Sequence, residues 1–226
     1  MTEVPPIRVR SSVATGAREV MPIAIAAAAF GVSFGILARD AGMGVVAPLV
    51  FSLTTFAGSA QFAAVSVLDQ GGALAAAIVA AVLLNLRYLA IGVAVAPALR
   101  GGRARRLAEA QLAVDESFAV AQRDGRVDRG RFLGAALVLL AAWTGGTALG
   151  VLGGGSLGDP ETYGLDAMFP ALFLALLAGQ LRSRSAVHAA VLGGGIALLL
   201  IPIATAGVPV MAAVTGALIA VRWSRS

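Results

Sequence analysis

Two polar motifs interrupt stretches of the chain that are otherwise apolar. Residues 56–62 (FAGSAQF) place a hydroxyl and an amide in the middle of one apolar run, and residues 85–88 (NLRY) place an amide and a guanidinium in the next. An arginine at the centre of a membrane span costs about 2.5 to 3.5 kcal/mol on insertion scales, so such groups usually face a pathway or a partner inside the protein. The candidate binding residues for a solute that crosses a membrane are Gly58, Ser59, Gln61, Asn85 and Arg87.

The spacing of these residues predicts interrupted helices. Asn85 and Arg87 are about 200° apart around a straight helix, so they cannot face one site unless the helix breaks there. The run that contains them, residues 71–99, would measure roughly 43 Å as one helix, against a hydrocarbon core of about 30 Å. Gly58 is the corresponding break point in the run before it. Membranes tolerate such breaks only where the freed backbone lines a cavity or is buried in protein.

Acidic residues could bind a coupling proton. Asp115 and Glu116 lie in the stretch from about Arg105 to Gln122, which is predicted to form one amphipathic helix with Asp115 at the flank of its apolar face and Glu116 opposite. Partial burial of that face would raise the pKa of a carboxyl group, whereas a solvated cytoplasmic helix would leave it unchanged. Asp166 is the third candidate. Arg87 either holds the carboxylate of a solute or pairs with an internal acid such as Asp115.

The composition requires a membrane. The chain is 58% hydrophobic and 13% charged, and its apolar residues form runs whose lengths suit transmembrane helices. We therefore predict an all-α, polytopic membrane protein with a single domain, residues 1–226, and about seven hydrophobic segments. The runs are 20–38, 45–68, 71–99, 132–152, 165–181, 186–206 and 208–222. The domain is divided into a polar N-terminus (1–19), a first helical half (20–99), an Arg-rich amphipathic connection (100–131) and a second helical half (132–222).

The arginines predict an orientation. The connection Arg100–Arg131 is the most basic loop, so the positive-inside rule places it, and with it the C-terminus, in the cytoplasm. Three crossings before this connection would put the N-terminus outside, where Arg8, Arg10 and Arg18 violate the same rule. Either the charge bias is overridden or one early run fails to cross the membrane.

The two halves share a weak sequence echo. Residues 48–61, with Pro48 and Gln61 at the ends, resemble residues 170–180, with Pro170 and Gln180 at the ends. If three early segments repeat as three later ones, the odd number gives an inverted repeat, as in many secondary transporters.

Several classes of chemistry lack the residues that they need. The chain has no cysteine, no cluster of residues with metal-ligand spacing and no phosphate-binding loop, so we expect no metal and no cofactor. The net charge of +5 comes from arginines at segment ends and in one loop, which argues against nucleic-acid binding. Gly31, Ser33 and Gly35 fit the Gly-x-Ser-x-Gly pattern of serine hydrolases, with His188 as the base, but the two glycines equally fit helix packing.

Four motifs in order resemble the AzlC family, the large subunits of branched-chain amino acid exporters. They are residues 56–62, 85–89 (NLRYL), 115–119 (DESFA) and 165–173 (LDAMFPALF), and they extend over nearly the whole chain. Tyr88 departs from the family pattern, in which a histidine follows the Asn-Leu-Arg core.

The resemblance implies export of leucine, isoleucine, valine and methionine across a bacterial cytoplasmic membrane, driven by the proton motive force. It also implies a smaller membrane subunit of the AzlD type as partner. The residues themselves fit a zwitterion with an apolar side chain, because polar groups lie among Val, Leu, Ile and Phe. The alternative from another class is a scaffold subunit, which does not transport and whose polar stripes bind a partner helix.

Overall fold

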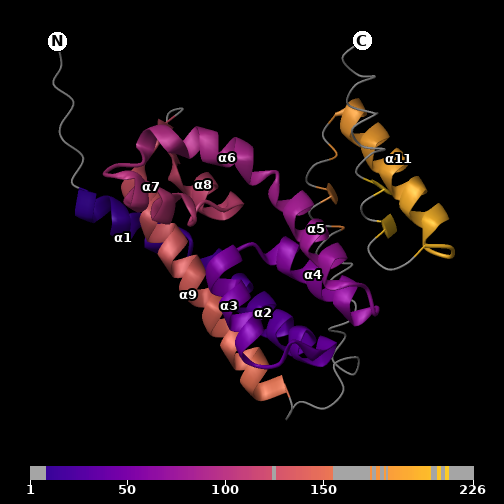
Figure 1. Cartoon of the computed structure of the whole chain (residues 1–226). Helices are drawn as coiled ribbons and strands as arrows, with labels where there is room; N and C mark the ends of the chain where they lie inside the picture. The colour runs from indigo at the N-terminus through magenta and orange to yellow at the C-terminus, as the bar shows by residue number, and fades with distance from the viewer. Residues whose placement is uncertain are drawn as a thin grey trace. The chain divides into compact units, whose positions relative to one another are not determined.

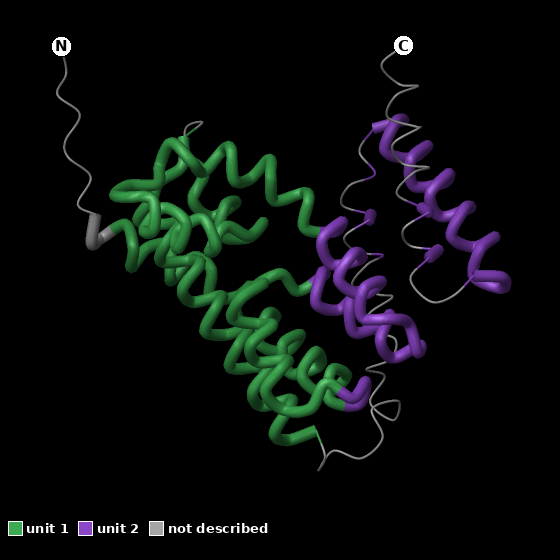
Figure 2. Tube along the Cα trace, viewed as in Figure 1, with its two compact units in different colours: residues 1–39, 43–58, 85–156 green, residues 40–42, 59–84, 157–226 purple. Residues whose placement is uncertain are grey.

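The computed structural model describes residues 9–123, 126–154 and 183–204, with residues 174, 177, 178, 181, 208, 209, 212 and 213. The chain forms two compact units (Figure 2): the first holds residues 1–39, 43–58 and 85–156, and the second holds 40–42, 59–84 and 157–226.

Helices dominate the described residues of both units (Figure 1). The elements of the first unit are α1 (Val9–Glu19), α2 (Met21–Ala38), α3 (Val46–Thr55), α6 (Tyr88–Val95), the 3₁₀ helix η2 (Ala96–Ala98), α7 (Arg103–Ala110), α8 (Asp115–Ala121), the strands β1 (Gln122–Arg123) and β2 (Arg126–Val127), and α9 (Arg129–Gly153). The π-helical turn η1 (Arg39–Met43) continues α2, α4 (Gly58–Asp69) starts at the boundary between the units, and α5 (Leu74–Asn85) and α11 (Arg184–Leu200) follow in the second unit.

Two of the described helices are long and apolar enough to cross a membrane, α2 with its π-helical continuation and α9. The bent pair formed by Leu74–Asn85 and Tyr88–Ala98 makes a third span if it is counted as one. The described residues therefore support two or three spans and do not confirm the predicted seven segments. The predicted runs 165–181 and 208–222 lie largely outside the described residues.

Both predicted helix breaks are present. α3 ends at Thr55, and Phe56 adopts the left-handed conformation (φ 43°, ψ 49°) before α4 begins at Gly58. α5 ends at Asn85, and α6 begins at Tyr88. The prediction of one amphipathic helix from Arg105 to Gln122 is wrong, because α7 ends at Ala110 and α8 starts at Asp115. The hydroxyl of Ser117 accepts the Val114 N–H at 3.0 Å, which satisfies a backbone donor at the new helix start.

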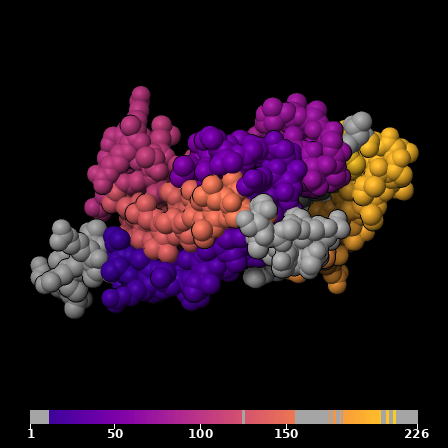
Figure 3. Space-filling view, turned by 90° about the horizontal axis from the view of Figure 1, so that it is seen from below, coloured from indigo at the N-terminus to yellow at the C-terminus, as the bar shows by residue number. Residues whose placement is uncertain are grey.

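The first unit is built on close packing of α1 and α2 against α9, through glycines on both sides. A Cβ atom at Gly31 or Gly35 would overlap backbone atoms of Trp143 or Thr147, and one at Gly146 or Gly150 would overlap backbone atoms of Ala28 or Val32. In the same way, a Cβ atom at Gly16 would overlap backbone atoms of Arg131, and one at Gly134 would overlap backbone atoms of Val13. Figure 3 shows the surface of α9 as a band against the indigo surface of α1 and α2. Small residues thus let the helix backbones touch, as in membrane helix pairs.

The register of these contacts fixes the direction of the helices. Residues 13–16 contact residues 131–134, residues 28–31 contact 143–146, and residues 32–35 contact 147–150. The residue numbers of α1 and α2 thus increase in the same direction as those of α9. α2 and α9 are therefore parallel. The predicted inverted repeat would make these first helices of the two halves antiparallel, and for this pair it is wrong. If the two halves are a repeat, parallel first helices require that the symmetry axis relating the halves runs along the helices.

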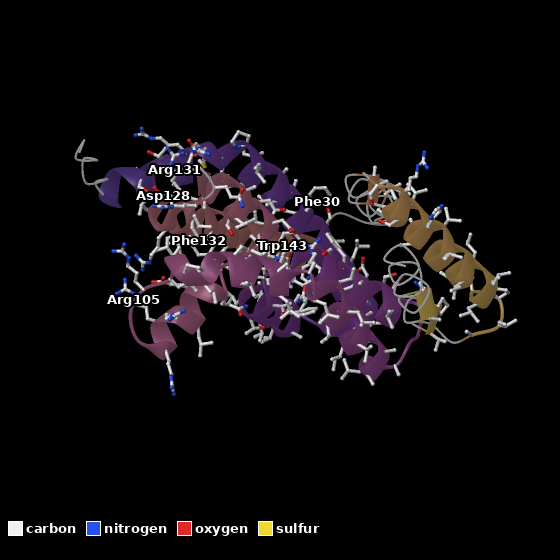
Figure 4. All side chains as sticks on the ribbon, turned by 90° about the horizontal axis from the view of Figure 1, so that it is seen from above. Phe30, Arg105, Asp128, Arg131, Phe132 and Trp143 are labelled. Carbon is white, nitrogen blue, oxygen red and sulfur yellow. The ribbon has the colours of Figure 1, made fainter. Side chains whose placement is uncertain are left out.

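Polar contacts hold the starts of α1 and α9 together. Ser12 donates a hydrogen bond to Asp128, the N-cap residue of α9, and Glu19 accepts hydrogen bonds from Arg131 at 2.7 Å. Figure 4 labels Asp128 and Arg131 at this end of α9. Burial alone would raise the pKa of Asp128, but its hydrogen bonds from Ser12 and from backbone N–H groups outweigh burial and lower it.

We expect adding one methyl group to the α2–α9 contact to destabilise the protein. Gly146→Ala would place its Cβ against the Ala28 carbonyl, and overpacking of this kind costs about 1 to 3 kcal/mol. Gly145→Ala is the matched control, since a Cβ there meets nothing within 4 Å and alanine favours helix. Thermal unfolding in detergent should show a lower Tm for Gly146→Ala alone. Equal Tm values for the two variants would contradict the close backbone contact.

The parallel helices also predict the side of α1. If α2 and α9 both cross the membrane, α1 and the Arg-rich connection share a side, which requires that one of the early runs does not cross. Because the chain has no cysteine, single cysteines at Ala14, Gln122 and Val45 can be labelled with an impermeant maleimide. Ala14→Cys and Gln122→Cys should label from one side and Val45→Cys from the other. Labelling of Ala14→Cys and Val45→Cys from the same side would contradict this topology.

Candidate functional site

The break between α3 and α4 lies against the middle of α9. A Cβ atom at Gly58 would come within 2.9 Å of the indole ring of Trp143, whose side chain is almost fully buried. Trp143 stands near the midpoint of α9 (Arg129–Gly153), as its label in Figure 4 shows. The break is therefore far from both ends of this 25-residue helix, and Gly58 is needed because the indole occupies the space of any larger side chain.

An aromatic cluster forms the wall beside this break. Phe34 of α2 stacks on Trp143 with ring centroids 5.9 Å apart, and Phe51 of α3 meets the Phe34 ring at 6.3 Å in an edge arrangement. The cluster joins three helices of the first unit. It offers an apolar surface of the kind that a branched or aromatic solute side chain contacts.

A buried pair of hydroxyl groups connects the same helices. Ser52 Oγ and Thr147 Oγ1 are 2.9 Å apart, both side chains are fully buried, and Thr147 also donates to the carbonyl oxygen of Trp143. Trp143, Thr147 and Ser52 are not among the binding residues predicted from the sequence. The available signal was the spacing of Trp143 and Thr147, one helical turn apart, beside Gly146 and Gly150.

The first turn of α4 carries two of the predicted binding residues. Ser59 and Gln61 follow Gly58 and are buried, with 5% and 0% of their surface exposed. The first backbone N–H groups of a helix have no partner within the helix and carry a partial positive charge. A helix that starts in the middle of a membrane protein therefore offers a carboxylate several donors. Ser59 and Gln61 belong to the second unit, whereas Gly58, Asn85 and Arg87 belong to the first.

The second break holds an ion pair. Arg87 lies 3.1 Å from Asp115, both half-exposed, and also donates a hydrogen bond to the hydroxyl of Tyr88 at 3.0 Å while its guanidinium lies over the Tyr88 ring. The structure thus brings Arg87 to Asp115, one of the two partners that the sequence left open. Asn85 ends α5, and its buried Oδ1 accepts no hydrogen bond from the described residues.

The acids of this region have different electrostatic environments. Desolvation by the surrounding protein raises the pKa of Glu116, and the adjacent Asp115 adds to the shift, while its own backbone N–H and Arg87 oppose it. Glu109 shows the opposite case, because its hydrogen bonds from Arg129 and then Arg105 lower its pKa. Desolvation thus favours the protonated form of Glu116, whereas the two arginines favour the charged form of Glu109. Asp166 lies outside the described residues.

The serine of the Gly-x-Ser-x-Gly pattern has a structural role. Ser33 donates its hydroxyl proton to the carbonyl of Ala29 at 3.1 Å, one turn back in α2. Gly31 and Gly35 are both used in the packing against α9. The pattern thus follows from helix contacts and provides no activated nucleophile in α2.

Broken apolar helices with polar groups at the breaks are the construction of solute transporters in membranes. Comparison with known proteins agrees with this class. A family model described as AzlC protein matches residues 22–157, and the chain belongs to the AzlC family. It is a membrane transport protein.

The relatives include proteins from bacteria and archaea. An uncharacterized membrane protein of Archaeoglobus fulgidus is 39% identical over 179 residues, which cover 78% of this chain and 79% of the relative. The branched-chain amino acid transport protein AzlC of Bacillus subtilis is 28% identical over 172 residues, covering 74% and 67%. An uncharacterized membrane protein of Helicobacter pylori is 25% identical over 154 residues, covering 66% and 67%. No solved structure matches the chain.

Proposed function

We propose that this protein is a secondary active exporter of branched-chain amino acids from the bacterial cytoplasm, driven by the proton motive force. The observation that carries the proposal is the helix break at Phe56–Gly58. It places the start of α4 beside Trp143, near the middle of α9 and away from both ends of that helix. The similarity to a branched-chain amino acid transport protein supplies the substrate class. The Arg-rich connection and the C-terminus are cytoplasmic in this proposal.

The substrate carboxylate binds at the first turn of α4, which includes Gly58, Ser59 and Gln61. Within the first unit, the wall formed by Phe34, Phe51 and Trp143 provides the apolar surface that suits a branched side chain. The substrate ammonium group is suited to Asn85 Oδ1, a buried acceptor at the other break.

Arg87 and Asp115 act as a latch in the proposed cycle. Their ion pair joins the α5–α6 break to the first residue of α8, so opening the pair frees the break to change its bend. Proton binding at Asp115 or at the neighbouring Glu116 weakens the attraction to Arg87, which couples proton movement to that change. A small membrane subunit of the AzlD type works with this chain. Asp166 remains the third acid proposed for coupling.

The direct test is efflux of labelled leucine, valine, alanine and lysine from preloaded cells, with and without an AzlD-type subunit and a protonophore. We expect leucine and valine efflux that requires the subunit and is abolished by the protonophore. Gln61→Ala and Arg87→Gln should each reduce it at least tenfold, the effect of about 1.4 kcal/mol. Gln70→Ala, which changes an exposed amide at the end of α4, is the matched control. Unchanged efflux in both site variants, with the protein in the membrane, would refute the site.

The raised pKa of Glu116 predicts a pH effect. A carboxyl with a raised pKa stays protonated at higher pH than an ordinary glutamate. The rate of efflux should therefore change with pH at a value above the usual glutamate range, where Glu116 loses its proton. Glu116→Gln fixes the protonated form and should flatten the pH profile of efflux while substrate exchange continues. Asp69→Asn, at the exposed end of α4, should leave the profile as in the wild type. A normal profile in Glu116→Gln would remove Glu116 from the coupling step.

The scaffold alternative makes a different prediction for the same cells. A scaffold would show no efflux of any of the four amino acids although the protein and its partner were inserted in the membrane.

A further inference from the structure

A cavity of about 520 Å³ lies in the first unit, at the end of α6 where the broken span meets the Arg-rich connection. One wall comes from α6 and η2, through Ala94, Pro97 and Ala98. The opposite wall is formed by Phe118 of α8 and Val127 of β2. This volume is typical of small-molecule sites, and the cavity is separate from the helix breaks of the proposed transport site.

The floor of the cavity is fixed by a hydrophobic core. Phe118 and Val127 pack against the buried cluster of Val95, Leu99, Ala113, Ala121 and Phe132. The two-stranded ribbon is held by its pairing of Gln122 with Val127 and by the backbone bond from Asp128 N to Ala121 O at 2.9 Å. Phe118 and Val127 are therefore held in place in the cavity wall by the core.

The polar side of the cavity carries the positive charge of Arg126. Arg105 and Arg129 pair with Glu109, and Arg123 and Arg131 pair with Glu19. Arg126 lies opposite Arg123 in the ribbon and lines the cavity together with Gln122. Within the described part of the chain, no carboxylate is in ion-pair distance of Arg126. The site thus combines a guanidinium and an amide with small apolar walls.

The position of the cavity defines its ligand. η2 ends the α5–α6 pair at Ala98, and α9 starts at Arg129, so the cavity lies at the level where both spans end. Lipid phosphates lie at this depth, and basic pockets beside span ends bind anionic headgroups. The exposed Arg100 and Arg103 add positive charge along the same stretch.

We propose that this cavity binds an anionic phospholipid of the leaflet on the arginine-rich side. Arg126 and Gln122 hold the phosphate, and the apolar walls hold the glycerol and the first methylene groups of an acyl chain. Because α6 and α8 form the walls and also carry the Arg87–Asp115 region, the bound lipid stabilises the pairing of these two helices.

The test uses the full-length protein in phosphatidylcholine nanodiscs with increasing phosphatidylglycerol, followed by thermal unfolding and by native mass spectrometry for retained lipid. We expect phosphatidylglycerol to raise the Tm and to be retained, and Arg126→Gln to weaken this binding roughly fivefold, the contribution of one arginine near an anionic surface. Arg103→Gln, in the same basic stretch but outside the cavity, is the matched control and should keep it.

Two further arms separate the site from general electrostatics. Ala98→Leu fills the apolar wall without changing charge and should also weaken lipid retention, while its Tm in phosphatidylcholine shows that it is folded. Glycerol phosphate, which has no acyl chain, should not raise the Tm. Equal effects of phosphatidylglycerol and phosphatidylcholine, equal losses in Arg103→Gln and Arg126→Gln, full retention in Ala98→Leu, or stabilisation by glycerol phosphate would each overturn the proposal.

Discussion

Close backbone contact between α2 and α9 is the constraint on which the first unit depends. Glycines at the two ends of each Gly-x-x-x-Gly pair, Gly31 with Gly35 and Gly146 with Gly150, bring the helix backbones together. At this separation the larger side chains must leave the contact and pack elsewhere, and Phe34 and Trp143 stack beside it. The aromatic wall, the hydroxyl pair Ser52–Thr147 and the position of the α3–α4 break all follow from where these two helices touch.

The strain at Phe56 is consistent with that constraint. A bulky residue in the left-handed region costs about 1 to 2 kcal/mol, and it persists only when its surroundings determine the local backbone. α3 is held on the α9 side by the Ser52–Thr147 pair and by the Phe34–Phe51 contact, and Gly58 is held by the Trp143 ring. The chain must turn between these two attachments within a few residues. The break is thus a consequence of packing and not of a proline or a loop sequence.

Local features of the sequence correctly predicted where the helices break. They did not predict the direction of α2 relative to α9 or the division of residues 105–122. Gly58 and Asn85 were identified because polar residues at unfavourable helical spacing in an apolar run are a local signal, and the Arg87–Asp115 pair was one of two alternatives. The parallel direction of α2 and α9 was missed because the echo between residues 48–61 and 170–180 records similarity of segments and not their direction. The division of 105–122 into two helices depends on Ser117 and on packing around Phe132, which periodicity cannot show.

The distribution of ion pairs separates structural from functional arginines. Glu109 and Glu19 each pair with two arginines near the start of α9, which fixes that end of the unit. Arg87 pairs with the half-exposed carboxylate of Asp115 at a helix break, with a second acid of raised pKa next to it. A pair that shares its surroundings with a protonatable neighbour can open when one proton binds, whereas Glu109, bound by two guanidiniums, resists protonation. Movement driven by protons is therefore expected at the α5–α6 break and not at the start of α9.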